Sequence, residues 1–228
     1  MNIIEINDLV KIYDDKKAIP VTAVDGIGLS FKEGEFAAVV GPSGSGKTTL
    51  LNLLGGLDEP TEGTINIGGI EMGHLKSREK IDFRMNHIGF VFQAYNLIPV
   101  LTAKENVEFI MHLQGKPKKE RDARAKELLN AVGLGDRMNA RPGKLSGGQQ
   151  QRVAVARALA SKPKFILADE PTANLDSKST EMLLEIMEKL NKEEKITFIF
   201  STHDARVVKK ARRVITIEDG RVMKDEVK

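Results

Sequence analysis

GPSGSGKT at residues 41–48 matches the phosphate-loop pattern of a glycine, four free positions and then Gly-Lys-Ser/Thr. Residues 35–40 before it are a short apolar run typical of a strand buried on both faces of a parallel sheet, and residues 49–54 after it have helical composition. A flexible Gly/Ser linker is the competing interpretation, but such a linker would not carry Lys-Thr-Thr between an apolar strand and a helix. The order of strand, glycine loop and helix therefore predicts a nucleotide-binding site.

Each part of this loop has a chemical reason. Gly41, Gly44 and Gly46 let the backbone turn so that successive N–H groups face an anion, and the start of the following helix adds its positive dipole end. Lys47 is expected to reach the β- and γ-phosphates, and the Thr48 hydroxyl to ligate Mg²⁺. The predicted ligands are therefore a nucleotide, ATP, and Mg²⁺.

The composition excludes several other classes of protein. The 228 residues, 41% of them apolar, are enough for one large domain or two small ones with a real core. The net charge of +3 indicates no uniform field for nucleic acid, and we interpret the basic runs at 116–121 and 209–213 as solvated helix faces. The chain has no cysteine, and its four histidines are too scattered for a zinc site. Mg²⁺ is the one metal we expect.

No stretch of the sequence predicts a targeting or membrane-spanning segment. Residues 1–8 read MNIIEIND, which is acidic and alternating rather than basic and then apolar. Nowhere do about 18 apolar residues run together. We therefore expect a soluble, cytoplasmic chain.

Alternating apolar and polar residues predict an antiparallel sheet beside the phosphate loop. Residues 3–13 alternate in this way, and residues 63–69 do so again between glycine turns. Residues 23–31 are a weaker strand candidate, since they contain two glycines. Tyr13 has two interpretations that its spacing does not separate, a ring that stacks on a nucleobase or a tyrosine on a half-buried strand.

Residues 94–160 are predicted to be mainly helical. Gln93 follows an apolar strand and precedes the apolar loop 94–101, which needs a cover from the helices or from a partner. Residues 102–105, TAKE, match the capping box that starts a helix. Because this part interrupts an alternation of strands and helices, we expect an inserted subdomain. The predicted division is 1–93 for the antiparallel β subdomain with the first part of the nucleotide-binding core, 94–160 for the helical subdomain and 161–228 for the second part of the core.

LSGGQ at residues 145–149 opens a further helix. Ser146 and Gln149 fit a capping box, so local rules explain both. They do not explain Gly147 and Gly148, whose bare N–H groups at a helix start predict a second anion site. One chain would then have two phosphate-binding helix starts and a single set of acids. This favours a dimer in which each helix start serves a different composite site.

Two acids end the apolar run KFILADE at residues 164–170. In a parallel sheet they lie at the carboxyl edge, where ligands bind. Asp169 fits a contact to Mg²⁺ through water, and Glu170 fits a base that polarises the attacking water. An acid pair after a strand is by itself better explained by a turn or a helix start, but the phosphate loop favours the catalytic interpretation.

His203 follows a further apolar strand, predicted at 195–201, and therefore lies at the same edge. A lone histidine is usually structural, but this position favours a contact to the γ-phosphate. The chain closes with residues 213–217 and 221–224, which predict a hairpin with a type I′ turn at Asp219-Gly220.

In order and spacing, these motifs resemble those of ABC-transporter ATP-binding subunits over essentially the whole chain. The specific part is LSGGQ, placed between a phosphate loop and an acid-tipped strand. Residues 92–99 and 168–176 further resemble the subgroup that serves lipoprotein release, macrolide efflux and the cell-division transporter-like complex. The resemblance implies an α/β fold, a P-loop NTPase (RecA-like) core with an antiparallel β subdomain and an inserted helical subdomain.

The resemblance also implies a role for each motif. It implies that Tyr13 stacks on adenine, that the signature residues bind the γ-phosphate held by the opposite subunit, and that residues 174–176 cross the dimer interface. The implied nucleotide-binding residues are Tyr13, Gly41, Pro42, Ser43, Gly44, Ser45, Gly46, Lys47, Thr48, Thr49, Ser146, Gly147, Gly148 and Gln149. The implied Mg²⁺-binding residues are Thr48, Gln93 and Asp169, and the implied catalytic residues are Glu170, His203 and Gln93.

The function expected from these features is ATP hydrolysis by in-line attack of water, in a homodimer that closes head to tail on two ATP molecules. The implied partner is an integral-membrane permease, which would hold the chain on the inner face of the membrane. An ATP-driven signal to a membrane partner without transport is an alternative that the sequence does not separate. A DNA-repair or translation protein is disfavoured because no basic patch is interleaved with aromatics, and we expect no nucleic acid. A small-molecule kinase is disfavoured because residues 94–160 offer the signature rather than an acceptor pocket.

Overall fold

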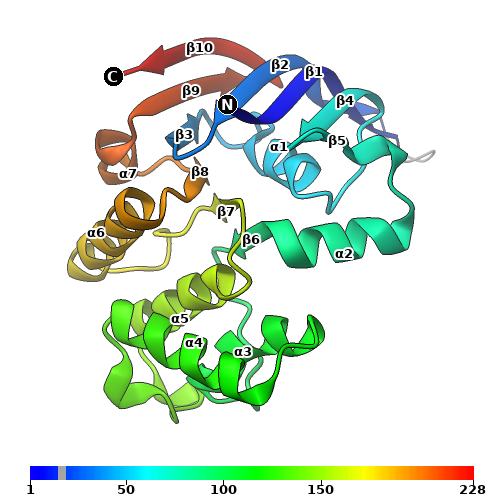
Figure 1. Cartoon of the computed structure of the whole chain (residues 1–228). Coiled ribbons are helices and arrows are strands. Elements are labelled where there is room, and N and C mark those ends of the chain that lie inside the picture. Colours follow the sequence, from blue (N-terminus) through cyan, green and yellow to red (C-terminus); the bar gives the residue numbers. More distant parts are fainter. Residues whose placement is uncertain (15–18) are drawn as a thin grey trace.

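The computed structural model describes residues 1–14 and 19–228, which form two β-sheets with helices around them (Figure 1). The antiparallel sheet has the order β2-β1-β4-β5. Gly26 has a φ of 68° and lies where the register between β1 and β2 shifts. The strand therefore continues through this glycine by means of a β-bulge. The strands of this sheet are β1 (Asn2–Tyr13), β2 (Val21–Lys32), β4 (Glu62–Ile67) and β5 (Ile70–Glu71).

The second sheet has the order β10-β9-β3-β8-β7-β6, and all its strands except β10 are parallel. Asp219 and Gly220, with φ of 44° and 77°, confirm the predicted turn before β10. β8 starts two residues later than predicted, because Lys195 adopts a left-handed conformation that ends the preceding helix. The strands are β3 (Phe36–Val40), β6 (Ile88–Val91), β7 (Phe165–Asp169), β8 (Thr197–Ser201), β9 (Arg213–Glu218) and β10 (Arg221–Val227).

Successive residues of the parallel strands enter two different hydrophobic clusters. In β7, Phe165 and Leu167 pack toward the antiparallel sheet, whereas Ile166 and Ala168 pack toward the helices of the other face. A strand that is covered on both faces needs an unbroken apolar sequence. This explains why residues 165–168 show no alternation.

The helices cover both faces of the parallel sheet. α1 lies between the two sheets, and α3, α4 and α5, green in Figure 1, form the helical layer within residues 94–160. Thr102 and Glu105 form the predicted capping box. Among the described residues, no helix has the length and apolar character to cross a bilayer. The helices are α1 (Lys47–Leu54), α2 (Ser77–His87), α3 (Ala103–Leu113), α4 (Lys118–Ala131), α5 (Gly147–Ala160), α6 (Ser177–Glu194) and α7 (Ala205–Lys210), with single 3₁₀ turns η1 (Met72–His74), η2 (Gly135–Arg137) and η3 (Pro142–Lys144).

The basic run at 209–213 is not one solvated helix face, so that interpretation was wrong for Arg213. Arg213 opens β9, and its guanidinium donates to both carboxylate oxygens of Asp225, at 2.8 and 2.7 Å. It also donates to Glu35, at 2.9 Å, and to the backbone carbonyl of Ser30 in β2. One half-buried arginine therefore ties the two sheets together.

We expect Arg213→Met to destabilise the fold by about 2–4 kcal/mol, because it leaves two partly buried carboxylates without their partner. The free energy of unfolding measured in urea tests this. Arg221→Met is the matched control, since Arg221 pairs with Asp25 through a side chain that is 69% exposed, and its effect should stay within about 0.5 kcal/mol. Equal effects of the two substitutions would contradict the role given to Arg213.

Candidate functional site

Four of the predicted site segments lie at one edge of the parallel sheet. β3, β8, β7 and β6 are neighbours in this order, and their parallel directions bring their carboxyl ends together. In the same order, these ends carry the phosphate loop, His203, the pair Asp169-Glu170 and Gln93. Segments from four parts of the chain thus meet where parallel sheets bind their ligands.

The phosphate loop packs tightly against neighbouring strands. Gly46 has a φ of 98°, and a Cβ at this position would lie 2.1 Å from the carbonyl oxygen of Ala23 in β2. Only glycine fits this approach. The loop is also anchored to the closing hairpin, because Gly220 donates its N–H to Ser45 and accepts from Asp25. The hairpin therefore holds one side of the loop in place.

The interior of the loop has the donors that a phosphate requires. Lys47 is 8% exposed, and its ammonium group donates to the carbonyl oxygens of Gly41, at 2.9 Å, and Pro42, at 2.8 Å. Among the described residues, the buried hydroxyl of Ser45 has no hydrogen-bond partner and no side chain caps α1. The N–H groups of the first turn of α1 are thus available to an anion. These features fit the phosphates of a nucleoside triphosphate.

Thr48 and Asp169 meet across the edge of the sheet. The Thr48 hydroxyl lies 3.0 and 3.2 Å from the two carboxylate oxygens of Asp169. Hydroxyl and carboxylate oxygens are hard ligands of the kind that Mg²⁺ takes, together with water and substrate phosphates. Within the described part of the chain, no group of three or more His, Cys, Asp or Glu side chains is placed to hold a metal ion. The residues present therefore fit a Mg²⁺ ion that shares its ligands with a nucleotide.

Glu170 and His203 form a second pair at this edge. His203 Nδ1 lies 2.8 Å from Glu170 Oε1, and Thr202 Oγ1 donates to Glu170 Oε2 at 3.4 Å. The Glu170 side chain is 16% exposed, and its φ of 44° lies in the left-handed region that costs energy for any residue except glycine. Its N–H donates to the Ser201 carbonyl at 2.8 Å, which holds this strained backbone in place. Strain of this kind is typical of functional positions.

The loop after Glu170 is fixed by residues that the sequence analysis did not select. Thr172 donates to Asp204 at 2.9 Å, and Asp204 also accepts from Arg206. The hydrogen bond from Arg206 is the main cause that lowers the pKa of Asp204 to about 2, although partial burial opposes it. Asp204 could have been found as the N-cap of α7, because its carboxylate accepts from the Arg206 N–H.

The segment after Gln93 is held by α5 and by the loop before α6. The backbone carbonyl of Gln93 accepts from the Asn174 side chain at 3.1 Å. Arg157 of α5 donates to the carbonyl oxygens of Tyr95 and Asn96, two consecutive residues with positive φ. Gln151, buried in α5, donates to the carbonyl oxygen of Pro171 at 2.8 Å. No local pattern marks Arg157 or Gln151, because their partners are distant in sequence.

The two glycines of LSGGQ lie close to side chains from neighbouring parts of the chain. Ser146 and Gln149 form the predicted capping box. A Cβ on Gly147 would lie 2.8 Å from the Tyr95 hydroxyl, and one on Gly148 would lie 2.6 Å from the hydroxyl oxygen of Ser179. A side chain at either position would require the end of the Tyr95 or Ser179 side chain to move, so close packing is a second reason for glycine here beside the predicted anion site.

The signature and the phosphate loop are separate within one chain. α5 begins in the helical layer, whereas α1 lies between the two sheets (Figure 1). Over the described residues, no hydrogen bond joins residues 145–149 to residues 41–49. The structure does not bring these two predicted phosphate-binding segments together in the monomer.

Tyr13 is a surface residue at the end of β1. Its side chain is 43% exposed, and it belongs to neither of the large hydrophobic clusters. Its hydroxyl donates at 2.7 Å to Asp58, which follows α1. The ring is thus tied to the loop after α1, and part of it is available to a ligand.

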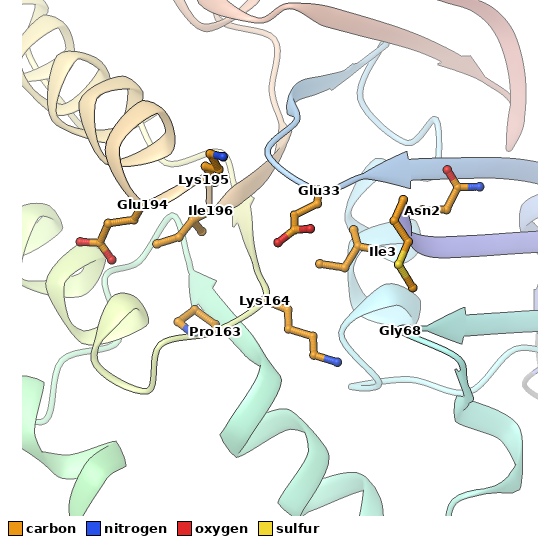
Figure 2. A pocket seen from close by; sticks show the side chains of 10 residues that line it. Asn2, Ile3, Glu33, Gly68, Pro163, Lys164, Glu194, Lys195 and Ile196 are labelled. Atoms are coloured by element: carbon orange, nitrogen blue, oxygen red, sulfur yellow. The ribbon is translucent and has the colours of Figure 1, made fainter.

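A cavity of about 270 Å³ opens at the opposite edge of the parallel sheet (Figure 2). Its walls include Glu33 before β3, Lys164 before β7 and Ile196 before β8, so it lies at the amino ends of the strands. It contains none of the predicted site residues. We therefore place the candidate site at the carboxyl edge and not in this cavity.

Comparison with known proteins gives one consistent family. The family described as ABC transporter matches residues 24–173. An uncharacterised ABC transporter ATP-binding protein of Thermotoga maritima is 51% identical over 220 residues, which cover 96% of this chain and 93% of that protein. The macrolide export ATP-binding/permease protein MacB of Rhodospirillum rubrum is 46% identical over 98% of this chain, which corresponds to 34% of that larger protein.

A solved structure shows the same fold. It is described as the dimeric structure of a post-hydrolysis state of the ATP-binding cassette MJ0796 bound to ADP and Pi, and it matches with a TM-score of 0.90 and 43% identity over 98% of each chain. The uncharacterised ABC transporter ATP-binding protein MJ0796 of Methanocaldococcus jannaschii is 46% identical over 98% of this chain and 96% of that protein. The P-loop NTPase fold expected from the motifs is therefore confirmed. This chain belongs to the ABC transporter family, as an ATP-binding subunit of the subgroup that its motifs resemble.

Proposed function

We propose that this chain binds ATP with Mg²⁺, hydrolyses it in a head-to-tail homodimer and thereby drives a membrane-embedded permease. The observation that carries the proposal is the meeting of two residue pairs at one sheet edge, Thr48 with Asp169 and Glu170 with His203. A phosphate loop beside two acids at adjacent strand ends is suited to the hydrolysis of a bound triphosphate. The related cassette solved with ADP and Pi supports this chemistry.

The phosphate loop would bind the triphosphate through the N–H groups of residues 41–49 and the Lys47 ammonium group. Thr48 and Asp169 would hold Mg²⁺, directly or through water, with Gln93 as a further ligand. When bound, Mg²⁺ neutralises charge on the β- and γ-phosphates. Tyr13 would stack on the adenine ring.

Glu170 would polarise the water that attacks the γ-phosphate in line with the departing ADP oxygen. Its position directly after β7 places its carboxylate one step beyond Asp169, so the two acids have different tasks. His203 would contact the γ-phosphate, and its bond to Glu170 Oε1 fixes both side chains in one arrangement. Thr202 contributes a further bond to the same carboxylate. The strained backbone of Glu170 supports a role that depends on position.

We expect Glu170→Gln to retain ATP binding but to slow hydrolysis by about 10²–10⁴-fold, the usual contribution of a positioned base. The variant should accumulate as an ATP-bound dimer, because the negative charge that opposes the γ-phosphate is gone. Phosphate release and gel filtration with ATP measure both effects. Glu226→Gln, which changes an exposed carboxylate in β10, is the control with unchanged turnover. Turnover within a few-fold of the original chain would contradict the role of Glu170.

A dimer would complete the site with the signature of a second chain. The signature and the phosphate loop lie apart in the monomer, and the related cassette is described as dimeric. Ser146, Gly147, Gly148 and Gln149 would then contact the γ-phosphate of ATP held by the other subunit. Residues 174–176 would lie at the interface, next to the Gln93 backbone that Asn174 already contacts.

Mixing two inactive variants tests the head-to-tail arrangement. We expect Lys47→Ala to abolish ATP binding, and Ser146→Arg to retain binding but to abolish dimerisation and turnover. A mixture of the two should recover part of the activity, because one composite site then combines an intact phosphate loop with an intact signature. An inactive mixture in which the heterodimer is demonstrated would rule out this arrangement.

The permease would dock on a groove rather than on the whole apolar loop at 94–101. Leu97 of that loop packs against the hydrophobic core of the helical layer. The loop therefore exposes less apolar surface than its sequence predicts. An apolar groove of about 250 Å³ lies beside it, lined by residues that include Phe90, Phe92, Phe109 and Leu113. Exposed apolar surface of this kind is typical of binding sites. The fusion of ATP-binding and permease parts in MacB supports a permease partner, which would place this chain on the inner face of the membrane.

The double substitution Phe109→Ser and Leu113→Ser should abolish co-purification with a membrane protein while it leaves ATP turnover and stability unchanged, since both side chains are exposed. Leu97→Ser should instead lower the stability, because it removes a core contact. Mass spectrometry of detergent-solubilised membranes and thermal unfolding distinguish the two effects. The control is Met223→Ser, which changes an exposed apolar residue in β10. Unaltered co-purification of the double variant would contradict the proposal that the permease docks in this groove.

A further inference from the structure

Tyr13 is held by two charged side chains that no sequence motif had singled out. Its hydroxyl donates to Asp58 Oδ2 at 2.7 Å, and Lys11 donates to Asp58 Oδ1 at the same distance. Lys11 also donates to the backbone carbonyl of Glu59 at 2.8 Å. The three side chains form one connected network on the surface of β1.

The network leaves part of the tyrosine ring exposed. The Lys11 ammonium group lies 4.9 Å from the ring centroid, a distance typical of a cation–π contact. That contact occupies one face, while 43% of the Tyr13 surface stays exposed. A flat molecule can therefore approach the part of the ring that stays exposed.

The anchor of this network is tied to the phosphate helix. Asp58 follows α1, and its N–H donates to the carbonyl oxygen of Asn52 within that helix. The same loop is bonded to β1, because Thr61 donates its N–H to Val10 and accepts from the Ile12 N–H. The position of the ring is thus fixed relative to the helix that begins at the phosphate loop.

The network is more than an exposed ion pair. The side chains of Lys11 and Asp58 are only 13% and 28% exposed. Partial burial raises the pKa of Asp58, but the hydrogen bonds from Lys11 and Tyr13 outweigh this and keep the pKa below its usual value. The carboxylate therefore remains an acceptor for the tyrosine hydroxyl at neutral pH.

We propose that Asp58 and Lys11 are positioning residues that fix the Tyr13 ring in the orientation in which it stacks on the base of the bound nucleotide. The inference rests on the proposed nucleotide site. A ring that is ordered before binding loses no rotamer freedom when the base binds. The binding free energy is therefore not reduced by the entropy cost of ordering this side chain. The effect concerns the base alone and leaves the phosphate contacts untouched.

Tyr13→Phe is the sharpest test, because it keeps the ring and removes only its bond to Asp58. We expect Tyr13→Phe, Asp58→Ala and Lys11→Met each to raise the Kd for MgATP by about 2- to 12-fold, the ordering cost of one side chain. The Kd for inorganic tripolyphosphate, which has no base, should stay unchanged in the full-length chain. Titration calorimetry measures both constants. KM for ATP should rise in the same proportion, with kcat unchanged.

Asp58→Asn and Lys80→Met are the matched controls. The Asp58→Asn substitution keeps an amide oxygen that still accepts from the tyrosine hydroxyl, so it should recover most of the affinity that Asp58→Ala loses. Lys80→Met removes an ion pair with Glu59 in the same loop, at 2.6 Å, without touching the Tyr13 network. It should leave both constants unchanged.

Three results would overturn the inference. Equal weakening of ATP and tripolyphosphate binding would make the network a general support of the fold. If Tyr13→Ala weakens ATP binding while Tyr13→Phe and Asp58→Ala do not, the stacking in the proposed function stands and the positioning role is wrong. If Tyr13→Ala also has no effect, the stacking itself fails along with the inference.

Discussion

The parallel pairing of β3, β8, β7 and β6 is the constraint on which the rest of this structure depends. Each strand contributes only a few residues, yet their common direction brings four carboxyl ends to one edge. The phosphate loop, Asp169, Glu170 and His203 become neighbours for this reason alone. A reversed strand would move its functional residue to the opposite edge, where the cavity of Figure 2 lies. The unbroken apolar sequences of these strands are thus a condition for the site, because only a sheet covered on both faces holds its strands in this way.

The parts that the sequence predicted are those whose structural cause is local. The phosphate loop, the caps at Thr102 and Ser146 and the turn at 219–220 each depend on residues within about one turn of the chain, and all have the predicted form. Family resemblance extended this to the fold as a whole. Residues whose partners are distant in sequence were not predictable, because no local pattern encodes them. Arg213 was predicted as the first residue of a hairpin strand, but its partners in β2 and β10 appear only when the sheets are assembled.

The signature glycines have more than one possible physical reason. Sequence reasoning explained Gly147 and Gly148 by an anion at the helix start, since capping accounts for the other residues. The structure adds close packing as a second reason, because a side chain at either glycine would have to displace the end of the Tyr95 or Ser179 side chain. A glycine that a ligand requires and a glycine that packing requires look the same in sequence. The two cases can be distinguished only when the spatial neighbours of the glycine are known. Here these neighbours belong to the loop after β6 and to the start of α6.

α5 links two surfaces that the proposed function uses. Its first turn carries the signature, and farther along the helix Gln151 and Arg157 donate to backbone carbonyl oxygens in the loops after β7 and β6. Arg157 also lines the apolar groove proposed for the permease. Burial lowers the pKa of this arginine, but the ordinary pKa of a guanidinium is so high that the side chain stays charged, and the two carbonyl oxygens of residues 95 and 96 compensate for its lost hydration. Because the helix is one hydrogen-bonded unit, the signature and the groove cannot move independently unless these bonds break, and this gives the two surfaces a direct physical connection.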